Sequence, residues 1–375
     1  MEIGAVLTST EMDGCAPAAD WSRWILQGRA PHSGAGSGPG PGPELQAAED
    51  VAQLASLGVS NVALTLEWAR LEPRPRRYDT QKIERLTNTL NDARSKGLTV
   101  WGCLVDGTLP GWFHDDDGGF GDDHNQNLVW PRHVDWIGEH FGDLVDGWIP
   151  QREPIRWALR RFLLAKAPPG STNSAAATKG VDDALKADGQ ASRLLAGTQP
   201  VAAFHTVRRV DGLVDNIKAA PKARWLRALM NDSWQRAVTE GDLRESFDRV
   251  IVQLRSGIVV DADGQWLPHP ASGPEMAIAD LRAVSETLAT TPIVAAGDLA
   301  DVKDSGRSRP DHLRYLLDHV AEAGRDLNVI GWWQTSPIDG YHWERGFELH
   351  PGLIDRSRNE SPTAEILKSA KPDVD

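Results

Sequence analysis

The feature that most restricts the fold of this chain of 375 residues is a repeated alternation of short apolar runs with longer amphipathic segments. Such an alternation is typical of βα units around a parallel sheet, whose strands are buried on both faces. We interpret as strands the runs 3–8, 61–66, 99–105, 147–151, 224–230, 250–254, 292–296 and 328–333. The segments interpreted as helices include 44–57, 80–96, 132–141 and 309–323. Eight strands predict one (β/α)8 TIM barrel that forms a single domain over residues 1–375.

Two segments interrupt this alternation and predict flexible loop insertions. Residues 32–43 read HSGAGSGPGPGP, and residues 170–180 read GSTNSAAATKG. Gly, Pro and Ser in such density disfavour both helices and central strands. The first of these loops follows the first strand, at the end of a barrel where active sites are built, so it is either a lid or a plain solvated linker.

Composition excludes several classes of partner. The 53 acidic side chains exceed the 40 basic ones and give a net charge of −13, which argues against nucleic acid or an anionic membrane surface. No apolar run approaches the ~20 residues that span a bilayer. A neutral or cationic small molecule fits this charge better, and the oligomeric state stays open.

Cysteine usage and the first residues predict a reduced, cytoplasmic protein. Cys15 and Cys103 are the only cysteines, too few for a disulfide framework or a thiolate metal site. The N-terminal MEIGAVLTST has no basic region followed by an apolar stretch. We find no Gly-rich phosphate loop and predict no cofactor. The acidic run at 114–127, HDDDGGFGDDHNQN, lacks the spacing of a calcium loop, so we predict a solvated loop and no metal site.

Polar residues at the carboxyl ends of the predicted strands define the candidate site, because these ends meet in one pocket of a TIM barrel. Glu153 is the strongest candidate, since it follows an apolar strand and precedes Pro154, where the strand must stop. The alternative for Glu153 is a structural ion pair with Arg152 or Arg156. The other candidates are Glu11, Asp106, Arg152, Asp298, Trp333, Asp339, His342 and Trp343.

These residues would crowd several carboxyl groups into one pocket. Mutual repulsion and burial should then raise the pKa of at least one of them, which could remain protonated near neutral pH and act as an acid. Arg152 could offset part of the repulsion by pairing with Glu11 or Asp106. For Glu11, Asp106 and Asp298, helix capping or turn formation is an equally good interpretation.

The segment WIPQREP, followed by KAPPG, resembles the Asn-Glu-Pro motif of glycoside hydrolase family 1, the β-glucosidase family. Four further segments resemble this family in the same order: GAVLTSTEMDG, LTLEWARLEP, GWWQTSPIDGYHWERGF and SPTAEILKSA. The resemblance implies a single TIM barrel, with Glu153 as the general acid/base and Trp343 facing the ligand. Trp333 fits either the core or the ligand site.

The departures from the family pattern lie in the sugar site. The family nucleophile is the Glu of a Thr-Glu-Asn-Gly motif, and TPIVAAGDLAD carries Gly297 at that position. Arg152 stands where the family has an Asn that contacts the sugar 2-hydroxyl. The other replaced positions are Glu11, Ala63, Asp106, Leu254 and His342.

Glycine can serve neither as nucleophile nor as base, so the resemblance implies an atypical glycoside-processing enzyme. Retaining hydrolysis needs two carboxyls ~5 to 5.5 Å apart, and inverting hydrolysis needs them ~6.5 to 9.5 Å apart with water between them. Asp298, which is nearest in sequence, or Asp106 or Glu11 is then the second carboxylate beside Glu153, and inversion is the more natural route. Two alternatives stay open: a biosynthetic cyclase, lyase or isomerase, and a catalytically silent protein that binds a sugar or metabolite.

Overall fold

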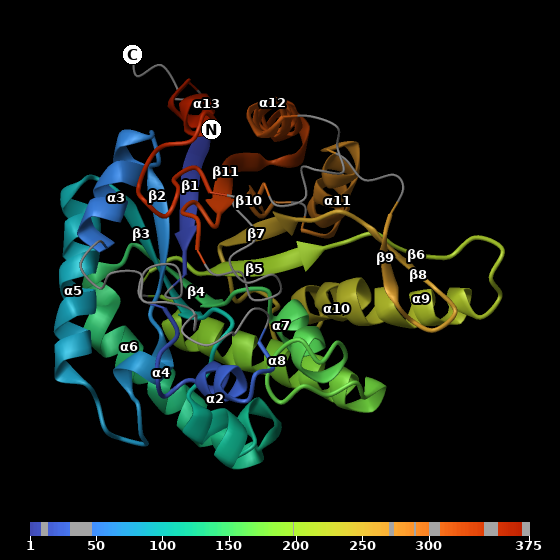
Figure 1. Cartoon of the computed structure of the whole chain (residues 1–375), viewed down its shortest axis with the longest axis horizontal. Helices are drawn as coiled ribbons and strands as arrows, with labels where there is room; N and C mark the ends of the chain where they lie inside the picture. The colour runs from blue at the N-terminus through green and yellow to red at the C-terminus, as the bar shows by residue number, and fades with distance from the viewer. Residues whose placement is uncertain are drawn as a thin grey trace.

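The computed structural model describes residues 1–8, 14–30, 47–197, 199–269, 274–288, 290–299, 308–340 and 352–369. Eight parallel strands form the barrel in the order β4-β3-β2-β1-β11-β10-β7-β5 (Figure 1). Their bounds are β1 Glu2–Leu7, β2 Asn61–Thr65, β3 Thr99–Val105, β4 Gly147–Gln151, β5 Ala202–Val207, β7 Arg249–Leu254, β10 Ile293–Gly297 and β11 Val329–Thr335. The bridges Trp148↔Val201 and Arg152↔Phe204 bring β4 and β5 together and nearly close the barrel.

The strands are buried on both faces, as the apolar runs predict. Side chains that point inward form one compact cluster, which includes Val6, Trp101, Ile149, Phe204 and Trp333. Side chains that point outward join a larger core between the strands and the helices. Residues therefore alternate between the barrel interior and the outer core along each strand.

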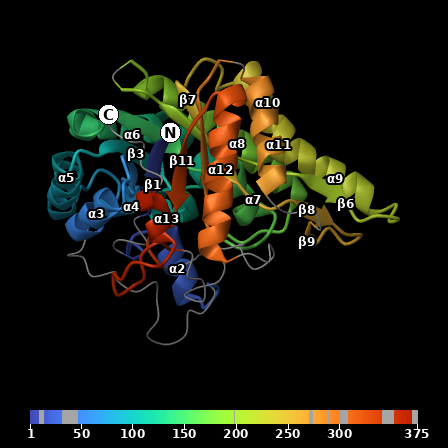
Figure 2. The ribbon, with the colours of Figure 1, turned by 90° about the horizontal axis from the view of Figure 1, so that it is seen from above.

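Helices surround the barrel (Figure 1, Figure 2). Asp79, Asn173 and Ser308 cap the helices that follow them, because each side chain accepts a hydrogen bond from a free backbone N–H of the first turn. The helices are α2 Asp20–Leu26, α3 Ala47–Ser56, α4 Trp68–Leu71, α5 Thr80–Ser95, α6 Trp130–Phe141, α7 Pro154–Phe162, α8 Ser174–Leu195, α9 Ala219–Arg227, α10 Ser233–Thr239, α11 Pro274–Thr287, α12 Arg309–Leu327 and α13 Ala364–Ser369. Among the described residues, no helix has both the length and the apolar character needed to cross a membrane.

A small second sheet extends away from the barrel beside α9 (Figure 1). Its strands are β6 Val210–Gly212, β8 Ile258–Val260 and β9 Trp266–Pro268. The segment between β5 and β7 carries α9 and β6 out to this sheet, and the chain returns to it after β7.

Two sequence-based predictions of local structure are wrong. The run 224–230, predicted as the fifth strand, is the end of α9 and part of a short π-helix, η5 (Ala228–Asp232). The buried residues Ala223, which precedes this run, and Leu226 and Met230 within it recur at three- and four-residue spacing, which places them on one face of a helix. The true fifth strand is β5. The other seven predicted strands are confirmed.

The second error concerns the predicted loop at 170–180. Helix α8 begins at Ser174, so most of this segment is helical. The Asn173 side chain accepts from the amide of Ala176 at 3.0 Å, and the three alanines that follow Ser174 are the best helix formers. The other predicted loop, at 32–43, lies outside the described residues.

Candidate active site

Glu153 stands where β4 ends and α7 begins. Its backbone has φ 52°, a left-handed conformation that costs a non-glycine residue about 1–3 kcal/mol and persists only where its surroundings fix it. The two neighbouring strands fix it here. The Glu153 amide donates to the carbonyl of Phe204 in β5 at 2.9 Å, and the Arg152 amide donates to the carbonyl of Val105 in β3 at 2.9 Å. Glu153 as a whole residue is only 5% exposed.

Several donors surround the Glu153 carboxylate. Arg255, which directly follows β7, holds both oxygens: Nε is 3.2 Å from Oε1 and Nη2 is 3.1 Å from Oε2. The Thr206 hydroxyl of β5 donates to Oε1. Arg156, one turn along α7, places Nη1 3.8 Å from Oε2. Two-point guanidinium contacts of this kind are among the strongest hydrogen bonds in proteins, so Arg255 is the main partner.

These arginines determine the protonation state of Glu153. Burial on its own would raise the pKa of this carboxyl, because the charged form loses water. The positive charges of Arg255, Arg156 and Arg152 outweigh burial and hold the pKa of Glu153 well below its ordinary value. We expected crowding to raise a pKa in this pocket, and for Glu153 the direction is the opposite. In the free protein Glu153 is therefore ionised near neutral pH.

Asp298 lies beside the same guanidinium. It follows β10, and its Oδ2 is 3.9 Å from Nη1 of Arg255. One arginine thus contacts two carboxylates that come from the ends of β4 and β10. A gap wide enough for a guanidinium is compatible with the ~6.5 to 9.5 Å that separate the two carboxyls of inverting glycosidases.

Asp106 forms a second ion pair next to this group. Its Oδ2 is 3.2 Å from Nη1 of Arg152, which confirms one of the two pairings expected for this arginine. The Thr65 hydroxyl of β2 donates to the same oxygen at 3.3 Å. Asp106 is thus held between the ends of β2 and β4.

Gly297, the last residue of β10, faces away from the barrel interior. Ala296 belongs to the interior cluster and Ala295 to the outer core, so alternation along the strand turns residue 297 outward. A Cβ at this position would lie 2.6 Å from the ring of Trp332, which packs in the outer core. Asp298 is therefore the residue at the end of β10 whose side chain reaches Arg255.

For Trp333 the sequence leaves two roles open, a place in the core and a place at the ligand site. Its ring lies in the barrel interior, edge-on to Trp101. Its indole N–H donates to Oε1 of Glu2 at 3.1 Å, and Glu2 begins β1 at the opposite end of the barrel from Glu153. Trp333 therefore belongs to the core. Three further predicted residues lie outside the described part of the chain: Glu11, His342 and Trp343.

Asp339 connects two segments near the C-terminus. Its Oδ1 accepts from the Gly352 amide at 2.8 Å, and its own amide donates to the Ile354 carbonyl at 2.8 Å. These bonds attach the segment after β11 to residues 352–354. A role for Asp339 in ligand binding stays a prediction.

Sequence reasoning missed two members of this group, Arg255 and Thr206. Thr206 was missed because its strand, β5, was assigned elsewhere. Arg255 directly follows the correctly predicted run 250–254. The same rule that selected Glu153, a polar residue at the carboxyl end of a buried strand, would have found it.

A comparison with known protein families identifies the family of this chain. The model of glycosyl hydrolase family 1 matches residues 45–259, more than half of the chain. The chain belongs to glycosyl hydrolase family 1. Within this family, 131 residues are 27% identical to "Beta-glucosidase 17" of Arabidopsis thaliana. That alignment covers 34% of this chain, and the chain spans only 25% of the length of that relative.

Solved structures of family 1 enzymes have the same fold. The β-glycosidase of the hyperthermophile Thermosphaera aggregans matches with a TM-score of 0.84 and 18% identity, over 99% of this chain and 97% of that one. The family 1 β-glucosidase of Thermotoga maritima matches with a TM-score of 0.84 and 15% identity, over 98% and 96% of the two chains. The fold is therefore that of a (β/α)8 family 1 glycosidase.

Proposed function

We propose that this chain is an atypical glycoside-processing enzyme in which Glu153 is the general acid/base and Asp298 is the second carboxylate. The observation that carries the proposal is the guanidinium of Arg255, which contacts both carboxylates at the ends of β4 and β10. This pair needs no side chain at Gly297, where the family places its nucleophile. Hydrolysis would proceed with inversion, because a gap of this width leaves room for water between the carboxyls.

The route requires a change in the protonation of Glu153. A glycoside that enters the site would separate Arg255 from Glu153 and so remove the strongest charge that holds its pKa down. Burial would remain and raise the pKa, so that Glu153 takes up a proton from solvent. Glu153 would then donate this proton to the glycosidic oxygen, while Asp298 accepts a proton from the attacking water.

The ligand is proposed to be a neutral or cationic glycoside. Its hydroxyl groups can accept from Arg152 and donate to Asp106, which pair with each other in the free protein. Glu11, His342 and Trp343 are proposed to complete the binding site. Asp106 is the alternative second carboxylate, and an Asp106→Asn variant distinguishes it from Asp298.

The test measures hydrolysis and its stereochemistry. Purified full-length protein is incubated with a panel of nitrophenyl glycosides, and proton NMR follows the anomer released first. We expect inversion, together with at least a 100-fold loss of turnover in Glu153→Gln and in Asp298→Asn. Asp123→Asn, an exposed acid in the segment between β3 and α6, serves as the matched control and should keep full activity. Release of the retained anomer would refute the proposed pair.

Two further outcomes contradict the proposal. A fluorosugar that traps family nucleophiles should not label the protein, and covalent labelling of any carboxylate would show a retaining mechanism. Product formed without incorporation of solvent oxygen would favour a cyclase, lyase or isomerase. Saturable sugar binding without any product would favour a catalytically silent binding protein.

A further inference from the structure

Thr206 supplies the one uncharged hydrogen bond that the Glu153 carboxylate receives from a side chain in the described part of the chain. Its hydroxyl donates to Oε1, and the two other bonds both come from Arg255. Alternation along β5 explains the contact, because Phe204 belongs to the interior cluster and Thr206, two residues further on, points to the same side. Thr206 is 4% exposed, and its hydroxyl has no other hydrogen-bond partner among the described residues.

The two oxygens of the Glu153 carboxylate face different sides of the site. Nε of Arg255 contacts Oε1 at 3.2 Å, whereas the terminal nitrogen Nη2 contacts Oε2 at 3.1 Å. The other terminal nitrogen, Nη1, lies 3.9 Å from Oδ2 of Asp298. The end of the guanidinium therefore occupies the space between Oε2 and Asp298, and a ligand that takes this space meets Oε2.

Displacement of Arg255 would leave these two oxygens with unequal partners. The proposed function requires a glycoside to separate this side chain from Glu153, and both of its hydrogen bonds are then lost. Oε1 keeps the Thr206 hydroxyl, whereas Oε2 keeps only the charge of Arg156, whose Nη1 is 3.8 Å away and beyond hydrogen-bond distance. An oxygen that accepts a hydrogen bond is the poorer site for a proton, so the incoming proton goes to Oε2.

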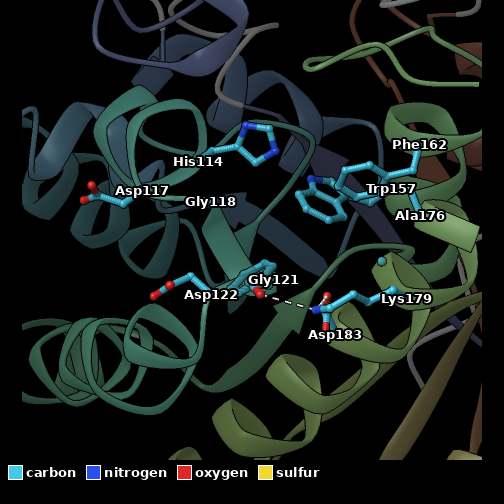
Figure 3. A pocket seen from close by; sticks show the side chains of 12 residues that line it. His114, Asp117, Gly118, Gly121, Asp122, Trp157, Phe162, Ala176, Lys179 and Asp183 are labelled. Carbon is cyan, nitrogen blue, oxygen red and sulfur yellow. Dashed lines mark hydrogen bonds and ion pairs between the residues drawn. The ribbon is translucent and has the colours of Figure 1, made fainter. Parts of the chain in front are cut away.

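The backbone around Glu153 is fixed, which leaves its carboxyl only the rotation of the side chain. In the first turn of α7 the Trp157 amide donates to the Glu153 carbonyl at 2.8 Å. The Trp157 ring lines a cavity of about 390 Å³, and no partner of the Glu153 carboxylate lines this cavity (Figure 3). The Arg161 guanidinium covers the ring at 4.3 Å, and Phe120 packs against it with ring centroids 5.7 Å apart. With the start of α7 held in this way, the Thr206 hydroxyl sets the rotation of the carboxyl.

We propose that Thr206 is a positioning residue, which holds Oε1 of Glu153 and so directs the acidic proton to Oε2, on the side of Asp298. This role rests on the proposed function, because it belongs to the same proton transfer. In that step the proton leaves Oε2 for the glycosidic oxygen, and the bond from that oxygen to the sugar breaks with its electron pair left on the oxygen. Water adds to the sugar and gives a proton to Asp298. Thr206 keeps its own proton throughout.

The test compares two leaving groups on the sugar that the nitrophenyl panel identifies. A 2,4-dinitrophenyl glycoside releases a stable phenolate without a proton, whereas a phenyl glycoside depends on the acid. Thr206→Val keeps the shape of the side chain and removes the hydroxyl. We expect its kcat to fall about tenfold or more for the phenyl glycoside and less than about threefold for the dinitrophenyl glycoside. Thr206→Ser, which keeps the donor, should restore hydrolysis of the phenyl glycoside.

The pH dependence of kcat gives a second readout. A hydroxyl that donates to the ionised form of Glu153 lowers its pKa, so the loss of this donor raises the pKa in the complex. Glu153 must be protonated to act, and the fall of kcat at high pH should therefore move to higher pH in Thr206→Val. Thr108→Val is the matched control, because the Thr108 hydroxyl donates to Oε1 of Glu67 at 3.0 Å, a buried carboxylate outside the proposed site. This control should keep the kcat values and the pH dependence of the parent.

The outcomes separate this role from the proposed function. Equal losses of Thr206→Val for both glycosides, without restoration by Thr206→Ser, would mean that the threonine only supports the fold and would overturn the inference. Parent-like kcat and pH dependence in Thr206→Val would overturn it as well, while activity of the parent would leave the proposed function intact. A parent that hydrolyses no glycoside of the panel would refute both. Circular dichroism checks the fold of each variant, and Thr206→Ala, which also lacks the donor, replaces Thr206→Val if that protein does not fold.

Discussion

Asp188 should make this fold less stable as pH rises, and replacing it with Asn should remove that dependence. The residue lies on α8 with 1% of its surface exposed, against the end of β4. Its carboxyl accepts one backbone hydrogen bond from Gln151, and Oδ1 has no hydrogen-bond partner. Burial raises the pKa of Asp188 from 3.8 to about 8, because one hydrogen bond cannot replace the water lost by the charged form.

The sign and the size of this pH dependence follow from the linkage between proton binding and folding. Between pH 4 and pH 8, folded Asp188 keeps a proton that the unfolded chain releases. The stability that this proton provides is complete below the ordinary pKa and is lost as pH rises through the folded pKa. Between these two pKa values the free energy of unfolding falls by about 1.4 kcal/mol per pH unit. Between pH 5 and pH 9 the parent should lose on the order of 4 kcal/mol relative to Asp188→Asn, which carries no charge at any pH.

Urea unfolding of the parent and of Asp188→Asn, measured at each unit from pH 5 to pH 9, tests this. The free energy of unfolding of the variant minus that of the parent should grow with pH up to about 8 and then level off. Burial also raises the pKa of Asp280 to about 7, but this residue is present in both proteins and cancels in the difference. A difference that stays constant across the range would refute the argument.

Two further predictions concern the thiols and the packing of the barrel. Burial raises the pKa of Cys15 to about 12 and the pKa of Cys103 well above its ordinary value. Because the thiolate is the reactive form, iodoacetamide at pH 7.5 should modify neither cysteine in the folded protein and both cysteines in denaturant. Rapid labelling of the folded chain would contradict this prediction. Gly4→Ala would place a Cβ 2.3 Å from the Trp333 ring and should reduce the free energy of unfolding by about 1–3 kcal/mol. Gly142→Ala, where no atom lies within 4 Å of the added Cβ, is its control in the same urea assay, and equal effects would count against the packing argument.

The fold could be predicted where a strand is apolar on both faces, as in β2 and β10. It could not be predicted at β5, because His205 and Thr206 break the apolar run near its end. His205 is nevertheless buried, stacked on Trp234 with ring centroids 4.5 Å apart. The competing run at 224–230, RWLRALM, is no more apolar than VAAFHTV at 201–207, since each has five apolar residues in seven. Composition alone did not reveal that its spacing was helical.

The candidate site could be predicted only as far as positions at strand ends. Pro154 fixed the end of β4 and so selected Glu153. The direction of its pKa shift could not be predicted, because it depends on Arg255, which is 102 residues further along the chain. The resemblance likewise places Gly297 at the position of the family nucleophile. The alternation of side chains along β10 could not be predicted, and it turns this position away from the barrel interior.

In the proposed mechanism, the charges around Glu153 couple ligand binding to proton uptake. A ligand that separates Arg255 from Glu153 would leave a buried carboxylate with a weaker set of partners, and breaking one side of a buried ion pair costs about 3–5 kcal/mol. Protonation of Glu153 removes that charge, so it offsets the cost and prepares the residue as an acid. Calorimetric titration with a glycoside in buffers of different ionisation enthalpy should therefore show net proton uptake near neutral pH, and Glu153→Gln should abolish it. Binding to the parent without proton uptake would mean that Arg255 stays in place and that Glu153 remains a structural carboxylate.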